Sequence, residues 1–364
     1  MNERLRRMQE LGQAPWVDEL SREDIKNGGL ERMIEDGIVG VTSNPAIFQK
    51  AIAGSDLYDE QLQQLARNED DPKEIFWGIA QTDIQDACEI FMPVYERTSG
   101  ADGRVSLEVQ PDIAYDSDAT IEEAARLHEL IDRPNLFVKI PATLQGLVSI
   151  EEMISRGKSI NVTLIFSLER YREVVRAYIR GIKRLIEGGG DPSGVRSVAS
   201  FFVSRIDSEA DSKLEELRAD DLKGELAIAN AKLAYQIYKG VFGGSRWKSL
   251  AEKGANRQRL LWASTSTKNP DYPDTIYVDN LVGPETVNTM PKKTIEVVMD
   301  HAEIRPTLEE GVEEAKELLK RLREAGFDYE DVTDTLEQEG IQKFADPFNE
   351  MLEEIKNKGR QLVS

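Results

Sequence analysis

Short apolar runs rich in β-branched residues alternate with longer amphipathic patterns along this chain. We identify eight such runs as strands: Trp16–Leu20, Gly37–Thr42, Val105–Val109, Leu136–Ile140, Asn161–Phe166, Ser197–Val203, Leu260–Ser264 and Thr286–Met290. Strands that alternate with helices pair in parallel through right-handed crossovers. Eight units predict a closed (β/α)8 TIM barrel, and the lack of Gly-x-Gly-x-x-Gly after any predicted strand disfavours a dinucleotide-binding open sheet.

The helical patterns between these runs are equally regular. Helices are predicted over Thr120–Asp132, Leu168–Glu187 and Glu225–Phe242, and glycines follow the last two. Residues 51–100 predict two or more helices before the third strand, and residues 292–364 predict a charged, helix-rich tail. Within that tail, Leu308–Ala325 is expected to pack outside the barrel as an amphipathic helix with a solvated face.

The fold class that follows is α/β, a TIM barrel with additional helices in the N-terminal half and a helical C-terminal extension. At 364 residues the chain exceeds the usual size of one simple core. Two ordinary domains were the alternative. We predict one domain over residues 1–364, with a barrel core from about 16 to 291 and an extension from about 292 to 364.

Charge and composition narrow the possible partners. The net charge of −21 argues against nucleic acid and anionic membranes, so an anionic ligand would need local positive charge. No apolar run is long enough to span a membrane, and the charged N-terminus lacks a signal core, so we expect a cytoplasmic protein. The lone Cys88 has helical spacing and is expected to be a buried structural residue.

Neither of the two histidines, His128 and His301, lies in a metal-binding or nucleophile–base pattern. We therefore expect no metal and no cofactor. The amphipathic tail is able to pack on its own barrel or on a second copy, which leaves a homodimer open.

Lys139 is the sharpest candidate for chemistry. It interrupts the buried-strand pattern that runs from Leu136 to Ile140. Loss of solvation disfavours the charged form of a buried lysine, and a neutral amine attacks a ketone to form an imine. The alternative is a structural lysine that is paired with a buried carboxylate such as Glu108.

Other polar residues stand at the predicted strand ends, where active sites of parallel barrels lie. Each of them alone is explained by an ordinary hydrogen bond, but together they suit a polyhydroxy, phosphorylated substrate. They are Asp18, Thr42, Asn44, Glu108, Asn161, Thr163, Ser200, Arg205, Ser264 and Lys268.

Five segments resemble the transaldolase family, in the family's order. They are Gly40–Phe48, Val105–Val109, Phe137–Thr143, Asn161–Phe166 and Ser200–Arg205. The resemblance runs from about Trp16 to Met290. It implies a metal-free Schiff-base enzyme of the non-oxidative pentose phosphate pathway. Such an enzyme transfers a dihydroxyacetone unit from sedoheptulose 7-phosphate or fructose 6-phosphate to glyceraldehyde 3-phosphate or erythrose 4-phosphate.

The resemblance also implies residue roles. Lys139 matches the Schiff-base lysine, and Asp18 matches the acid/base for carbon–carbon cleavage. Glu108 and Thr163 match the pair that positions a water molecule. The substrate-binding matches are Asn44, Asn161 and Ser200 for the hydroxyl groups and Arg205 for the phosphate.

One segment departs from the family pattern. Where better-known branches have Phe-Arg-Asn after the seventh strand, this chain has Ser266-Thr267-Lys268-Asn269-Pro270, which resembles the longer bacterial branch. Lys268 would then bind phosphate as a point charge. Two rivals remain: a fructose-6-phosphate-type aldolase that releases free dihydroxyacetone, and a non-catalytic sugar-phosphate-binding barrel.

Overall fold

Eight parallel strands close into a barrel in the computed structural model, which describes residues 1–363. Each strand pairs with the next in the chain, and the last pairs with the first. The strands are β1 (Gln13–Val17), β2 (Gly40–Thr42), β3 (Arg104–Glu108), β4 (Leu136–Pro141), β5 (Ile160–Ile165), β6 (Ser197–Phe202), β7 (Arg259–Ala263) and β8 (Thr286–Met290). The predicted TIM barrel is confirmed.

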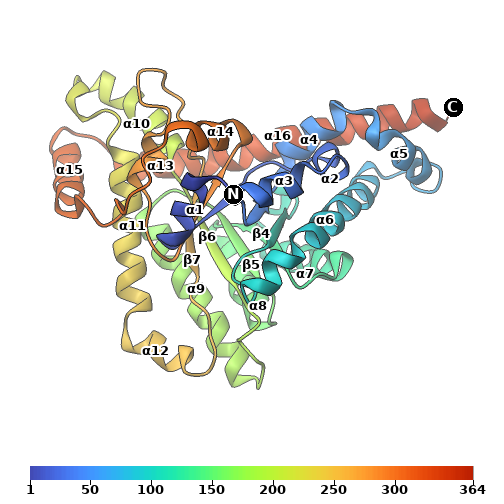
Figure 1. The fold of residues 1–364 in the computed structure, drawn as a ribbon, viewed down its shortest axis with the longest axis horizontal. Coiled ribbons are helices and arrows are strands. Elements are labelled where there is room, and N and C mark those ends of the chain that lie inside the picture. The colour runs from blue at the N-terminus through green and yellow to red at the C-terminus, as the bar shows by residue number, and fades with distance from the viewer. Residues whose placement is uncertain (364) are drawn as a thin grey trace.

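Helices surround the barrel and cross one end of it (Figure 1). Those that precede β5 are α1 (Glu3–Glu10), α2 (Arg22–Lys26), α3 (Gly29–Asp36), α4 (Pro45–Ala53), α5 (Asp59–Ala66), α6 (Pro72–Arg97), α7 (Ser117–Ile131) and α8 (Leu144–Ser155). Those that follow it are α9 (Leu168–Glu187), α10 (Ser204–Glu216), α11 (Leu226–Phe242), α12 (Ser245–Ala251), α13 (Ile276–Asn280), α14 (Lys292–His301), α15 (Val312–Glu324) and α16 (Tyr329–Val363). Short 3₁₀ turns are η1 (Asp56–Tyr58), η2 (Pro111–Ile113) and η3 (Asp220–Leu222).

The first predicted strand was misplaced by three residues. The prediction was Trp16–Leu20, whereas β1 is Gln13–Val17. Gln13 is polar and Pro15 disfavours a strand interior, so the β-prone run in the sequence begins only at Trp16. The true start of β1 follows Gly12, which turns the chain with φ of 83°. Asp18 nevertheless stands directly after the strand, as the prediction requires.

Aromatic rings pack in the barrel below the polar residues of its carboxyl end. Side chains two residues apart on a strand point the same way, so Trp16 and Phe137 lie one layer below Asp18 and Lys139. The Trp16 and Phe137 rings pack with centroids 6.2 Å apart. A Cβ atom on Gly40 would lie 2.6 Å from the Trp16 ring, so only glycine fits there.

Helices are present in both regions where extra helices were predicted, residues 51–100 and the C-terminal tail. α5 and α6 fill the insertion before β3, and the tail forms α14, α15 and α16. α15 packs against α11 outside the barrel, as expected for Leu308–Ala325. α16 instead runs across the carboxyl end of the barrel and packs on α4, α5 and α6 (Figure 1).

The structure also describes the surroundings of Cys88 and of the two histidines. Cys88 is completely buried in α6, as predicted. His301 is exposed between two aspartates, whereas His128 is packed on α7, where burial lowers its pKa to about 4. No helix within residues 1–363 combines the length and apolar character that a membrane span requires.

Candidate active site

A cavity of about 540 Å³ opens at the carboxyl end of the barrel. Seven of the nine predicted site residues line it: Asp18, Asn44, Lys139, Thr163, Ser200, Arg205 and Lys268. The other two, Glu108 and Asn161, lie behind this lining and contact it through hydrogen bonds or ion pairs. Residues that are far apart in sequence therefore meet where a parallel barrel places its active site.

Lys139 projects from β4 between two polar neighbours. The register pairs it with Glu108 on β3 and with Asn161 on β5. Its Nζ atom lies 3.0 Å from Glu108 Oε2 and donates to the Ser43 carbonyl at 3.1 Å. The ion pair expected of a structural lysine is thus present. However, Lys139 also lines the cavity, so its amine is within reach of a ligand.

The Glu108 carboxyl group is poised to exchange protons. Burial raises its pKa, whereas Lys139 opposes the rise, Asp18 adds to it and Arg205 also opposes it. A carboxylate with a raised pKa is a better proton acceptor at neutral pH. Thr163 Oγ1 is buried and has no hydrogen-bond partner within residues 1–363, whereas Glu108 Oε2 is held by Lys139. A buried hydroxyl without a partner has capacity to bind a water molecule or a substrate hydroxyl.

A local irregularity in β5 sets the position of Thr163. The register against β6 shifts between Val162 and Ile165, and Leu164 has φ of 59°. A bulge of this kind changes the direction of the neighbouring side chains. Leu164 is a non-glycine residue in the left-handed region, where backbone strain often accompanies a functional site.

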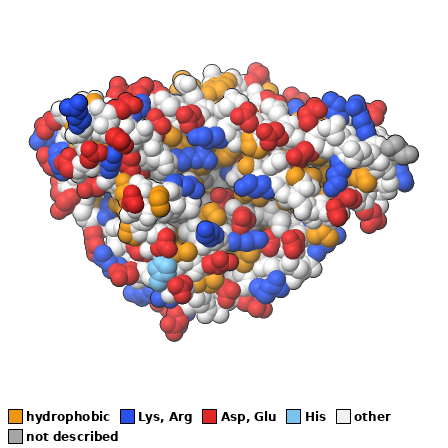
Figure 2. Space-filling view, turned by 90° about the horizontal axis from the view of Figure 1, so that it is seen from above, with side chains coloured by type: hydrophobic (Ala, Val, Ile, Leu, Met, Phe, Trp, Pro, Cys, Tyr) orange, Lys and Arg blue, Asp and Glu red, His pale blue; other side chains and the backbone are white. Residues whose placement is uncertain are grey.

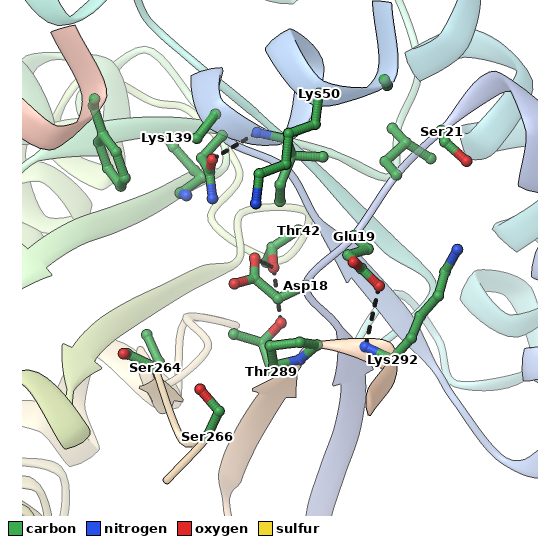
Figure 3. A pocket seen from close by; sticks show the side chains of 18 of the residues that line it. Asp18, Glu19, Ser21, Thr42, Lys50, Lys139, Ser264, Ser266, Thr289 and Lys292 are labelled. Atoms are coloured by element: carbon green, nitrogen blue, oxygen red, sulfur yellow. Dashed lines mark hydrogen bonds between the residues drawn. The ribbon is translucent and has the colours of Figure 1, made fainter. Parts of the chain in front are cut away.

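Asp18 ends a chain of hydrogen bonds at the base of the cavity. The Thr42 hydroxyl lies 2.6 Å from Asp18 Oδ1 and 2.7 Å from the Thr289 hydroxyl (Figure 3). These contacts fix the position of the Asp18 carboxylate at the cavity.

The three predicted hydroxyl-binding residues differ in their freedom to bind. Asn44 caps α4 through its Oδ1 atom, which accepts from the Ile47 amide at 3.1 Å. Ser200 lines the cavity and donates to Asn161 Oδ1 at 2.7 Å. Asn161 is completely buried and donates to Ser106 Oγ at 3.1 Å. Asn161 therefore contacts Ser200 from behind the cavity lining, and hydroxyl binding by Asn161 itself stays a prediction.

Arg205 and Lys268 form a pair of neighbouring cations. Arg205 stands at the start of α10, stacks on the Phe202 ring at 5.1 Å, and has a buried Nη1 atom without a hydrogen-bond partner among residues 1–363. Partial loss of solvation lowers the pKa of Lys268, and the charge of Arg205 lowers it further. A bound dianion would relieve this repulsion, and it would match the donor fork of Arg205.

Comparison with known proteins adds the decisive observation. Residues 15–355 match the family model described as transaldolase/fructose-6-phosphate aldolase. This chain belongs to that family. Proteins named transaldolase from Frankia alni and Acidothermus cellulolyticus are 47% and 48% identical to it, over 97% and 96% of this chain and 96% and 95% of theirs. A transaldolase from Trichodesmium erythraeum is 45% identical over 98% of this chain and 97% of its own.

The transaldolase resemblance did not point to two further cations at the cavity. Lys50 extends from α4 into the cavity from the same side as Lys139 (Figure 3). Lys292 pairs with Asp24 at 2.6 Å and donates its backbone amide to Glu19. Figure 2 shows basic side chains around the hollow on this face. An anionic ligand of this strongly acidic chain would need local positive charge, and these cations supply it.

Phe344 is a second omission, and no local pattern could have revealed it. It lies on α16, in the predicted C-terminal extension, and it lines the same cavity. Its ring centroid is 5.7 Å from Lys139 Nζ. The helical spacing of Phe344 and Phe348 indicated a buried face, but not the surface that the face covers.

Proposed function

We propose that this transaldolase-type enzyme transfers a dihydroxyacetone unit through a Schiff base on Lys139. The donor is sedoheptulose 7-phosphate or fructose 6-phosphate, and the acceptor is glyceraldehyde 3-phosphate or erythrose 4-phosphate. One arrangement carries the proposal: the Lys139 amine lines the cavity and lies 3.0 Å from a carboxyl group whose pKa is raised by burial.

The first steps use Lys139, Glu108 and Thr163. The amine attacks the C2 carbonyl of the ketose to give a carbinolamine, which loses water to form the imine. Glu108 takes and returns the protons, with a water molecule held between its carboxyl group and the Thr163 hydroxyl. The contact between Glu108 and Lys139 and the unpartnered Thr163 Oγ1 atom support this role.

Asp18 serves the carbon–carbon cleavage. It removes the C4 hydroxyl proton while the C3–C4 bond breaks, and the bonding electrons move into the imine, which becomes an enamine. The aldose phosphate leaves, and the reverse steps join the enamine to the acceptor aldehyde. The hydrogen bond from Thr42 keeps Asp18 oriented for both directions.

Arg205 and Lys268 would bind the phosphate of either aldose, and Asn44 and Ser200 would bind the dihydroxyacetone hydroxyls. All four residues line the cavity with Lys139. Arg205 supplies a planar fork and Lys268 a point charge.

Trapping with borohydride tests this proposal. The enzyme is incubated with fructose 6-phosphate, reduced with borohydride and mapped by peptide mass spectrometry. A reduced three-carbon adduct is expected on Lys139, and prior addition of erythrose 4-phosphate should remove it. A folded enzyme that binds the sugar phosphate but forms no adduct on Lys139 would instead be a binding barrel. A free-ketone aldolase would release dihydroxyacetone as fast as it cleaves the donor.

Three further predictions from the sequence stay proposals: a cytoplasmic location, one domain over residues 1–364, and a homodimer. The packing of α16 on α4, α5 and α6 supports one domain, because it joins the end of the chain to the N-terminal half. Light scattering after gel filtration tests the dimer, and a single unfolding transition seen by two probes tests the single domain.

A further inference from the structure

The longest helix of the molecule, α16, crosses the barrel mouth as a strap. At its start, the Tyr329 hydroxyl accepts from the Leu168 amide and donates to Asn230 Oδ1 at 2.7 Å. Near its end, Glu354 accepts from Gln49 of α4, and Lys358 pairs with Asp59 of α5. Both ends are thus fixed to opposite sides of the barrel (Figure 1).

The middle of the strap is held very close to the strand ends. A Cβ atom on Gly340 would lie 3.0 Å from Leu164 Cδ2, in β5. Glycine therefore allows this close approach without any shift of the Leu164 side chain. One turn farther along α16, Phe344 faces the cavity, and another turn on, Phe348 packs edge-to-face on Phe76 at 5.6 Å.

Phe344 covers the reactive amine. Its ring centroid lies 5.7 Å from Lys139 Nζ, and its side chain is 5% exposed. This distance lies within the range of a cation–π contact, which favours a positively charged nitrogen below the ring. A protonated imine on Lys139 carries its charge at the same nitrogen. The apolar ring also occupies space from which water would approach.

Water is what separates transfer from release. After the aldose leaves, a proton returning to C3 of the enamine regenerates the imine. Water then adds to C2, the C–N bond of the carbinolamine breaks, and the Lys139 amine and free dihydroxyacetone result. Transfer to an acceptor requires that the enamine adduct outlast the interval before the next aldehyde binds.

We propose that Phe344 determines this partition: its ring shields the three-carbon adduct on Lys139 from bulk water, so that transfer outcompetes release. The inference rests on the proposed Schiff-base function. It gives the C-terminal extension a direct role in specificity, since α16 supplies a wall of the site. Phe344 is a specificity residue, and the bond-making groups remain those of the strand ends.

A matched pair of variants tests the role of the ring. Phe344→Leu removes the ring over Lys139, whereas Phe348→Leu makes the same change one turn away, against Phe76 and outside the cavity. Free dihydroxyacetone is measured with a dehydrogenase, and transfer product is measured in the same sample with fructose 6-phosphate and erythrose 4-phosphate. The ratio of the two products does not depend on the fraction of enzyme that is folded.

The expected result is a rise of about tenfold in the release-to-transfer ratio for Phe344→Leu, with Phe348→Leu within about twofold of the unaltered enzyme. An unchanged ratio in Phe344→Leu would overturn the inference. Equal rises in both variants would also overturn it, because they would trace the effect to a loosened helix. Borohydride trapping on Lys139 of the unaltered enzyme is run first, and its failure would reject the Schiff-base proposal itself.

Discussion

The floor and the rim of the cavity are built in different ways. We call Glu108, Lys139, Asn161, Thr163 and Ser200 the floor, and Lys50, Arg205, Lys268 and Lys292 the rim. Floor side chains are at most 6% exposed and stand on strands. Rim side chains stand on helices and loops, and Lys50 and Lys268 are exposed.

The difference matches two tasks in the proposed mechanism, chemistry on the floor and phosphate binding at the rim. Proton transfer and imine formation require atoms held within hydrogen-bond distance, which the barrel register provides. Attraction of a phosphate requires charge more than exact position, and flexible lysines supply it. The comparison therefore predicts that floor substitutions lower kcat, whereas rim substitutions mainly raise KM.

The largest predicted effect is a loss of activity that distinguishes Lys139 from Lys50. Lys139→Met should lower activity by at least about 10³-fold, because methionine cannot form an imine. Lys50→Met, the same change on the rim, should leave kcat within about threefold. Both are measured by coupled transaldolase assay on variants with unaltered circular dichroism. A Lys139→Met enzyme with a tenth of the original activity would place the nucleophile elsewhere.

The next effect probes proton transfer on the floor. Glu108→Gln should lower kcat by about 10²-fold with little change in KM, since the amide keeps the shape but cannot accept a proton. Because burial raises the pKa of Glu108, the base form appears only at higher pH than for an exposed carboxyl. The acid limb of the rate profile should thus lie above the ordinary carboxyl range and disappear in the variant. An unchanged limb would assign it to another group.

A smaller effect distinguishes two cations of the rim, Arg205 and Lys268. Arg205→Met should raise KM for sugar phosphates by about 30-fold, and Lys268→Met by only about fivefold, because the buried fork binds more strongly than an exposed lysine. Neither change should affect KM for unphosphorylated glyceraldehyde as acceptor. Steady-state kinetics with both acceptors check this, and added salt should weaken the Lys268 effect more. Equal losses with glyceraldehyde would contradict a phosphate-binding role.

The smallest predicted effect concerns the stability of the fold and the buried carboxyl group of Asp207. Asp207 of α10 accepts from the Tyr277 hydroxyl at 2.9 Å and the Ala227 amide at 2.7 Å, and burial raises its pKa to about 7. The folded state therefore holds a proton that the unfolded state has lost, and stability falls as pH rises from about 4 to 7.

Asp207→Asn should remove this dependence. At pH 8 the variant is expected to be about 1 kcal/mol more stable than the unaltered enzyme, since weaker hydrogen bonds offset part of the gain. The advantage should shrink at pH 5. Urea unfolding at both pH values measures it, and a variant that is less stable at pH 8 would contradict a buried, destabilising charge.

The strands and most floor residues could be predicted because their signals are local. A lysine inside an apolar strand, and polar residues where such strands stop, are visible without knowing the fold. The barrel rule then gathers them at one end. β1 was misplaced because its first half contains the polar Gln13 and Pro15, which do not resemble a buried strand.

The sequence by itself determined the barrel, most of its strands and the presence of a lysine inside the fourth strand, because hydrophobic periodicity and parallel-sheet topology are local rules that act repeatedly. Only the tertiary structure decided that Asn161 lies behind Ser200, that Lys50 lines the cavity and that the Phe344 ring lies near Lys139. Those facts depend on packing between segments as much as 205 residues apart, from Lys139 to Phe344. An amphipathic helix shows that it has a face to bury, but its partner is chosen by the shape of the folded barrel.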